Sequence, residues 1–97
     1  MKVGLEKLES HEGIVVKALL DSGATGLFMD MIFAREKGFK MEKLKNPLLV
    51  KNVDRTVNVG GAIIHQVECN MFFKGHVERV RMDVYNLGKI EVILGML

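Results

Sequence analysis

A single carboxylate, Asp21, stands where an apolar stretch meets a tight turn, in Leu19-Leu20-Asp21-Ser22-Gly23-Ala24-Thr25. A carboxylate beside a buried strand loses hydration and needs nearby donors to stay charged. Ser22 brings a hydroxyl group, and Gly23 lets a backbone N–H approach the carboxylate. This arrangement suits acid–base chemistry, but it also suits a helix N-cap, where Asp and Ser are common. Taken alone, the seven residues leave both interpretations open.

The segments on either side of Asp21 predict a strand and a helix. Residues 14–20 are rich in β-branched side chains and predict a strand that is buried at its end. Residues 28–37 predict a short helix that stops at Gly38. One face of this helix carries Phe28, Met31 and Ile32, with Arg35 at its edge. The polar residues 1–12 are expected to form either a flexible terminus or a strand that pairs only in an assembly.

The rest of the chain predicts further strands joined by turns. Pro47 marks a loop before a strand at 48–50, and residues 53–64 predict a hairpin. Alternation of apolar and polar residues then predicts two strands, with these side chains turned inward: Val67, Cys69, Met71 and Phe73, then Val80, Met82 and Val84. A last strand is expected at 90–94. The sequence therefore predicts an all-β, mostly antiparallel fold with one short helix, forming a single domain over residues 1–97.

The composition is that of an ordinary globular chain. Its 97 residues are 48% hydrophobic and 27% charged, which allows a modest core that oligomerisation would help to stabilise. The net charge of +2 and the scattered basic residues give no basis for a nucleic-acid partner. No apolar run approaches the roughly 20 residues of a membrane helix, and the first residues lack a signal-peptide core. The single cysteine, Cys69, cannot form an internal disulfide, which favours a reducing compartment.

Three segments occur together in an order that resembles a known family. They are the Leu-Leu-Asp-Ser-Gly-Ala stretch ending at Ala24, the Asn-Val-Asp stretch at 52–54 with a glycine-bearing hairpin, and the late strand Ile93-Leu94-Gly95. The set covers residues 14–95. It resembles the retropepsins, the aspartic proteases of retroviruses and long-terminal-repeat retrotransposons, and in particular the protease segment of gypsy-type Gag-Pol polyproteins. The resemblance implies a retropepsin-like β-barrel, closed or partly open, with one short helix and a flap hairpin.

Hydrolysis of a peptide bond by carboxylates needs two of them facing one water molecule. Two carboxylates in contact cannot both ionise, so the pair shares a proton. This chain holds one Asp-Ser-Gly, and Asp30, Asp54 and Asp83 lack its strand-then-glycine context. The second carboxylate is therefore expected from Asp21 of another copy, across a two-fold axis. The predicted partner is thus a second copy of the chain.

The resemblance also implies roles for single residues. Asp21 would be the catalytic acid and base, Ser22 would hydrogen-bond across the two-fold axis, and Gly23 would permit the turn. Residues 55–63 would form the flap, closing over an extended peptide of a Gag-Pol-type polyprotein. The implied substrate-contacting residues are Ala24, Thr25, Val57, Asn58, Val59, Gly60, Gly61 and Ile93. No cofactor is implied, and the implied location is the cytoplasm, including the interior of virus-like particles.

Other functions compete with this interpretation. A retropepsin fold without turnover would be a peptide-binding or dimerisation module, and a structural β-domain would use Asp21 only as a helix cap. A metal site at His65, Cys69 and His76 has the right ligand types, but it lacks a paired spacing such as Cys-x-x-Cys, so none is expected. In the family a short helix follows the Ile-Leu-Gly strand. The chain is therefore expected to be truncated at its C-terminus, with a weaker dimer.

Overall fold

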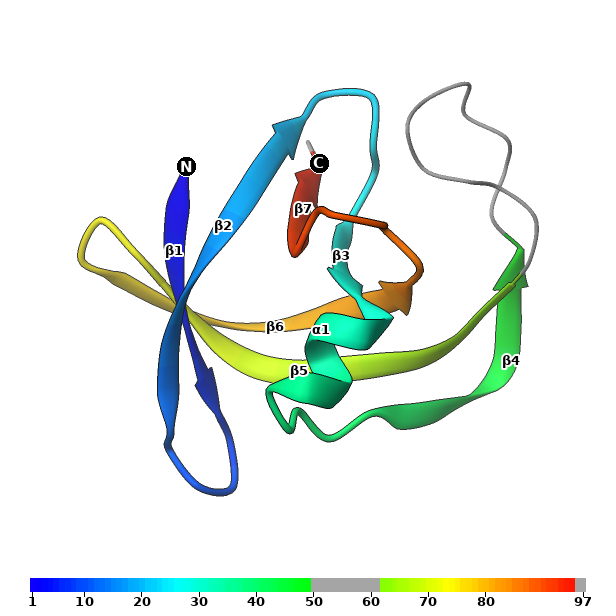
Figure 1. The fold of residues 1–97 in the computed structure, drawn as a ribbon, viewed down its shortest axis with the longest axis horizontal. Coiled ribbons are helices and arrows are strands. Elements are labelled where there is room, and N and C mark those ends of the chain that lie inside the picture. The colour runs from blue at the N-terminus through cyan, green and yellow to red at the C-terminus, as the bar shows by residue number, and fades with distance from the viewer. Residues whose placement is uncertain (50–61, 96–97) are drawn as a thin grey trace.

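The computed structural model describes residues 1–49 and 62–95. In these ranges the chain forms seven strands and one short helix (Figure 1). In chain order the elements are β1 (Lys2–Lys7), β2 (Gly13–Asp21), β3 (Leu27–Asp30), α1 (Met31–Glu36), β4 (Glu42–Leu49), β5 (Ala62–Phe73), β6 (His76–Tyr85) and β7 (Val92–Gly95). Within the same ranges, no helix combines the length and apolar content needed to cross a membrane.

Six of the strands close into a ring in the order β1-β2-β7-β3-β6-β5, because β1 pairs with both β2 and β5. The remaining strand, β4, pairs with β5 outside the ring. The β2–β7 and β3–β6 pairs are parallel and the other pairs are antiparallel. The predicted retropepsin-like barrel of mostly antiparallel strands with one short helix is confirmed. The predicted flap at 55–63 lies almost entirely outside the described residues.

Residues 2–7 form β1, which pairs with β2 and β5 of the same chain. The expectation of a flexible terminus, or of a strand that pairs only in an assembly, is therefore wrong. Val3 lies opposite Val16 of β2, and Leu5 lies opposite both Ile14 of β2 and Met71 of β5. Val3 and Leu5 are buried, whereas Gly4 between them and Lys2 and Glu6 beside them are more exposed. The strand is therefore specified by its alternation, which the high average polarity of residues 1–12 conceals.

The predicted helix at 28–37 is wrong in its first turn. Residues Leu27–Asp30 form β3, which pairs with β7 on one side and β6 on the other. Pairing on both sides outweighs the helical spacing of the apolar residues, because strand formation depends strongly on tertiary context. The helix α1 begins only at Met31, and its buried residues are Phe33 and Ala34. Ile32, expected on the buried face, is exposed.

The predicted loop at Pro47 is also wrong, because Pro47 lies inside β4. The pairing of β4 with β5 shifts register between Lys43 and Leu48, which indicates a bulge or irregularity around the proline. Proline cannot donate a ladder hydrogen bond, so in sheets it occurs at edges and bulges. β4 stands at the end of the strand order, where that missing donor is tolerated.

The β5–β6 hairpin forms as predicted. Phe73 lies opposite His76, so the loop has two residues, Lys74 and Gly75. Both have positive φ angles, 48° and 80°, as a type I′ hairpin turn requires. The inward alternation is confirmed, since Met71 and Phe73 are partly buried and these side chains are fully buried: Val67, Cys69, Val80, Met82 and Val84.

The barrel interior is filled by one main cluster, and a smaller cluster lies beside it. Members of the main cluster include Val3, Leu5, Val16, Ala18, Met29, Val67, Cys69, Met82, Val92 and Leu94. The smaller cluster comprises Ile63, Tyr85, Leu87 and Ile93. The predicted burial at the end of β2 is wrong, because Leu19 is 43% and Leu20 61% exposed. The β1–β2 register reaches only Lys17, so the last residues of β2 are paired with β7 alone.

Candidate active site

Asp21 is the last residue of β2 and lies in register with Gly95, the last residue of β7. β7 lies between β2 and β3, parallel to the first and antiparallel to the second. Residues 22–26, which connect β2 to β3, therefore pass over the end of β7 (Figure 1). This crossing holds Asp21 at one end of the barrel.

The turn after Asp21 is closed by the aspartate itself. Its Oδ1 accepts a hydrogen bond of 2.9 Å from the backbone N–H of Gly23, and its carbonyl oxygen accepts one of 3.2 Å from Ala24. Among the described residues, no other donor is recorded on the carboxylate. Asp21 is partly buried, while Ser22 and Gly23 are exposed. One carboxylate oxygen is thus fixed by the turn and the other is open to a further group.

Gly95 makes this turn sterically possible. Its N–H donates a hydrogen bond of 2.8 Å to the carbonyl oxygen of Gly26. A Cβ placed on Gly95 would lie 2.5 Å from the Gly26 oxygen and 2.6 Å from the Ala24 oxygen. Both contacts are with backbone, which cannot swing aside, so only glycine fits. The Asp-Ser-Gly and Ile-Leu-Gly motifs, far apart in the sequence, are therefore two sides of one contact.

The face of β2 that carries Asp21 also carries Lys17 and Leu19, because alternate strand residues share a face. Leu19 lies in register with Ile93 of β7. Ile93, an expected substrate-contacting residue, is only 3% exposed and packs in the smaller cluster. Leu19 is the more accessible apolar side chain on this face. Leu19 is not among the substrate-contacting residues that the family resemblance implies, although strand alternation places it on the face of Asp21, two residues earlier.

The other expected substrate-contacting residues divide into two groups. Ala24 is partly buried against the smaller cluster, and Thr25 is exposed in the turn beside it. Five expected residues lie outside the described residues: Val57, Asn58, Val59, Gly60 and Gly61. The described part of the chain therefore brings together Asp21, Ser22, Gly23, Ala24 and Thr25 on one turn.

A second carboxylate, Asp30, is buried and has a structural role. Its Oδ2 accepts a hydrogen bond of 3.0 Å from the N–H of Phe33, which caps α1, and its Oδ1 accepts one of 2.9 Å from Leu87. Asp30 thereby joins the start of α1 to the turn after β6. The cap of the helix is Asp30, so the interpretation of Asp21 as that cap is wrong.

His65, Cys69 and His76 do not converge. Cys69 is fully buried on β5, whereas His76 is exposed at the start of β6, opposite Phe73. Burial, with a smaller contribution from Glu68, raises the pKa of the Cys69 thiol to about 11, which keeps it protonated at neutral pH. Within residues 1–49 and 62–95, no group of three or more His, Cys, Asp or Glu side chains is placed to hold a metal ion.

The sequence of this chain matches a family model described as the PEG10/RTL1 protease domain. The match covers residues 17–97, which include all of the Asp21 turn and the Gly95 contact. This family comprises retropepsin-like protease domains of gypsy retrotransposon-derived proteins. The closed barrel, with an Asp-Ser-Gly turn crossing an Ile-Leu-Gly strand, agrees with that match. The chain belongs to the PEG10/RTL1 protease-domain family and is a retropepsin-like protease domain.

Proposed function

We propose that this chain is an aspartic endopeptidase that acts as a homodimer, with Asp21 of each copy forming one catalytic pair. The observation that carries the proposal is the placement of Asp21. It ends β2 beside Gly95, with one carboxylate oxygen held by the N–H of Gly23. Asp30, the other buried carboxylate described above, is occupied by two backbone donors and is not available for chemistry. A second Asp21 is the partner that the chemistry requires.

In such a pair the two carboxylates share one proton, because two negative charges in contact cannot both be retained. The ionised Asp21 removes a proton from a water molecule, and the water oxygen attacks the carbonyl carbon of the peptide bond. The protonated Asp21 donates a hydrogen bond to the carbonyl oxygen and stabilises its developing negative charge. The amide nitrogen then accepts a proton from the pair and leaves as the amine, and the pair again shares one proton.

The surface around Asp21 supports self-association. Leu20, next to the carboxylate, is 61% exposed although its strand phase matches that of buried Ala18. In the proposed dimer the second copy covers this side chain and removes its apolar surface from water. The exposed hydroxyl of Ser22 is available to hydrogen-bond to the second copy. In the two-fold arrangement each copy contributes the same residues to the other.

The proposed substrate is an extended segment of a Gag-Pol-type polyprotein. An extended chain can form strand-like hydrogen bonds with exposed backbone, and the flap at 55–63 would close over it. Membership in a family of gypsy retrotransposon-derived protease domains supports this substrate class. The apolar side chain of Leu19, on the same face as Asp21, suits an aliphatic substrate residue next to the cleaved bond.

The proposal is tested by cleavage of a peptide library at mildly acidic pH with wild type and with Asp21→Asn. Cleavage is expected from wild type and lost in Asp21→Asn. In dilute solution the rate should rise with the square of the protein concentration, because the active species is a dimer. Asp83→Asn is the matched control and should retain activity. Asp83 lies on β6, outside the Asp21 turn, where it accepts a side-chain hydrogen bond from Gln66.

Mixing the two proteins separates a shared site from two independent ones. Excess Asp21→Asn should inhibit wild type, because a mixed dimer holds only one ionisable carboxylate. Activity that is proportional to wild-type protein and indifferent to the added variant would refute the shared site. A stable dimer that binds peptides but cleaves none would point to the binding module.

A further inference from the structure

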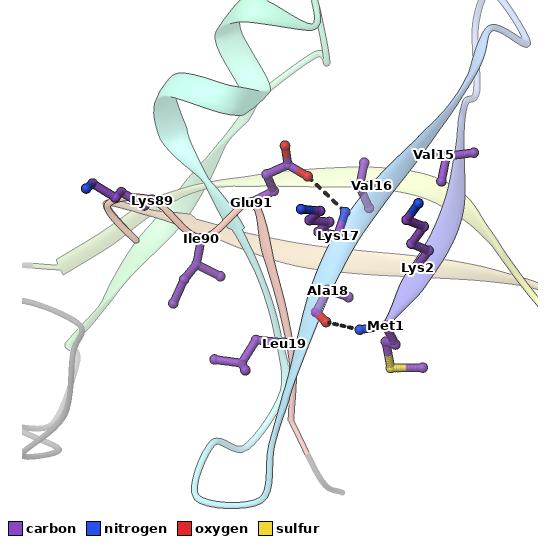
Figure 2. A pocket seen from close by; sticks show the side chains of 10 residues that line it. All are labelled: Met1, Lys2, Val15, Val16, Lys17, Ala18, Leu19, Lys89, Ile90 and Glu91. Atoms are coloured by element: carbon purple, nitrogen blue, oxygen red, sulfur yellow. Dashed lines mark hydrogen bonds between the residues drawn. The ribbon is translucent and has the colours of Figure 1, made fainter.

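A groove runs beside β2 on the face that carries Asp21 (Figure 2). Its apolar lining includes Met1, Leu19 and Ile90. Three lysines, Lys2, Lys17 and Lys89, also line it, from β1, β2 and the turn before β7. Figure 2 shows the side chains of Lys89, Lys17 and Lys2 spread across the lining, with Met1, Leu19 and Ile90 on one side of them and Val15 and Val16 on the other. The lining of the groove thus combines aliphatic side chains with three positively charged ones.

The positive charge in the groove is not neutralised by the described residues. No carboxylate there lies within ion-pair distance of Lys2, Lys17 or Lys89. Glu91, the single acid in the lining, accepts a hydrogen bond of 2.9 Å from the backbone N–H of Lys17 instead. Lys2 and Lys17 are direct cross-strand partners, and like charges in that position repel each other. A bound anionic group would relieve this repulsion.

The groove and Asp21 are linked by β2, whose residues 15–19 line the groove and whose last residue is Asp21. Lys17, Leu19 and Asp21 alternate along one face of β2. Lys17 stands four residues before Asp21, which corresponds to about 13 Å along a strand. An extended substrate covers the same length in three or four residues. Leu19 therefore lies near the cleaved bond, and Lys17 with its cross-strand partner Lys2 lies three or four residues away from it.

We propose that this groove selects peptide substrates that carry Asp or Glu about three or four residues from the cleaved bond, with an aliphatic residue nearer to it. The inference rests on the proposed function, because it assigns the groove to the substrate of the Asp21 site. Charge complementarity identifies the occupant as an acidic segment. In a two-fold dimer the second copy supplies the same lysines on the other side of the cleaved bond.

The experiment measures kcat/KM for matched peptides that have Glu, Gln or Lys at the distal positions around an aliphatic centre. Wild type should prefer Glu over Gln by roughly two- to fivefold for each lysine engaged, because exposed ion pairs are individually weak. The preference should fall in 0.5 M salt, where charges are screened over about 4 Å. Lys17→Glu and Lys89→Glu should each weaken this preference, and the double variant should weaken it further. Lys45→Glu, on β4 and outside the groove, should leave it unchanged.

Binding of the same peptides to Asp21→Asn, followed by fluorescence anisotropy, separates the two proposals. If wild type cleaves peptides without preferring acidic ones, and Lys17→Glu and Lys89→Glu show the same lack of preference, the groove assignment is refuted while the proposed protease activity stands. If the protein binds acidic peptides preferentially but wild type cleaves none, the proposed protease activity is refuted and the proposed peptide selectivity of the groove is retained. Preference for Lys-bearing peptides, or tighter binding of both kinds in high salt, would also overturn the groove assignment.

Discussion

The carbonyl oxygen of Gly26 accepts a hydrogen bond of 2.8 Å from the N–H of Gly95, and the same oxygen occupies the space that a Cβ on Gly95 would need. One short contact therefore fixes the connection after β2 against the end of β7. Because Asp21 lies in register with Gly95, the contact also fixes the position of the carboxylate.

Gly95→Ala should therefore damage the active-site turn more than a typical glycine substitution. The added methyl group meets two backbone oxygens, and we expect a loss of about 3 kcal/mol of stability, at the upper end of overpacking effects. Chemical denaturation measures the loss, and peptide cleavage should disappear with it. Gly13→Ala is the control, since its Cβ would meet nothing closer than 3.7 Å and should cost little. Equal stability of the two variants would contradict the steric argument.

Asp30→Ala should destabilise the fold through two lost hydrogen bonds. Removal of the cap on α1 costs about 1 kcal/mol, and the buried N–H of Leu87 left without an acceptor costs about 1–3 kcal/mol more. For a domain of this size the melting temperature should fall by roughly 10–20 °C. Asp83→Ala, which loses one side-chain hydrogen bond, should cost about 1 kcal/mol. A smaller effect at Asp30 than at Asp83 would show that Asp30 does not join these elements.

The buried thiol of Cys69 should make stability depend on pH in the alkaline range. Its pKa rises from 9.0 to about 11 on folding, so the folded state keeps a proton that the unfolded state releases. The stability difference between wild type and Cys69→Ala should be constant below about pH 9 and should shrink as pH rises toward 11. Denaturation of both proteins across this range measures it. A difference that grows with pH would contradict the assignment, as would rapid alkylation of the native thiol at neutral pH.

Leu20→Lys should weaken the proposed dimer without unfolding the chain. Leu20 is already 61% exposed, so its substitution should change monomer stability by only about 0.5 kcal/mol. Sedimentation should show more monomer, and cleavage at low concentration should fall. Val77→Lys is matched in exposure, at 59%, but lies on β6 away from the Asp21 turn, and it should leave association unchanged. Dimers of equal affinity in the two variants would exclude Leu20 from the interface.

The sequence by itself determined the features that depend on short-range patterns. Alternation specified the two strands β5 and β6, and residues 74–76 indicated a turn between them, which the structure narrows to Lys74 and Gly75. The joint occurrence of Asp-Ser-Gly and Ile-Leu-Gly indicated a retropepsin-like barrel, which the family match and the strand order confirm. The homodimer, the catalytic role of Asp21 and the cleavage of a Gag-Pol-type polyprotein stay predictions.

Only the tertiary structure decided how those segments meet. Residues 28–30 have helical spacing, yet they form β3 because β6 and β7 offer partners on both sides. Asp30, rather than Asp21, caps α1 because β3 takes up residues 27–30 and the helix begins only at Met31. Leu19 and Leu20 are exposed because β1 does not extend beside them. Such outcomes depend on contacts between distant residues, and local propensities do not encode those contacts.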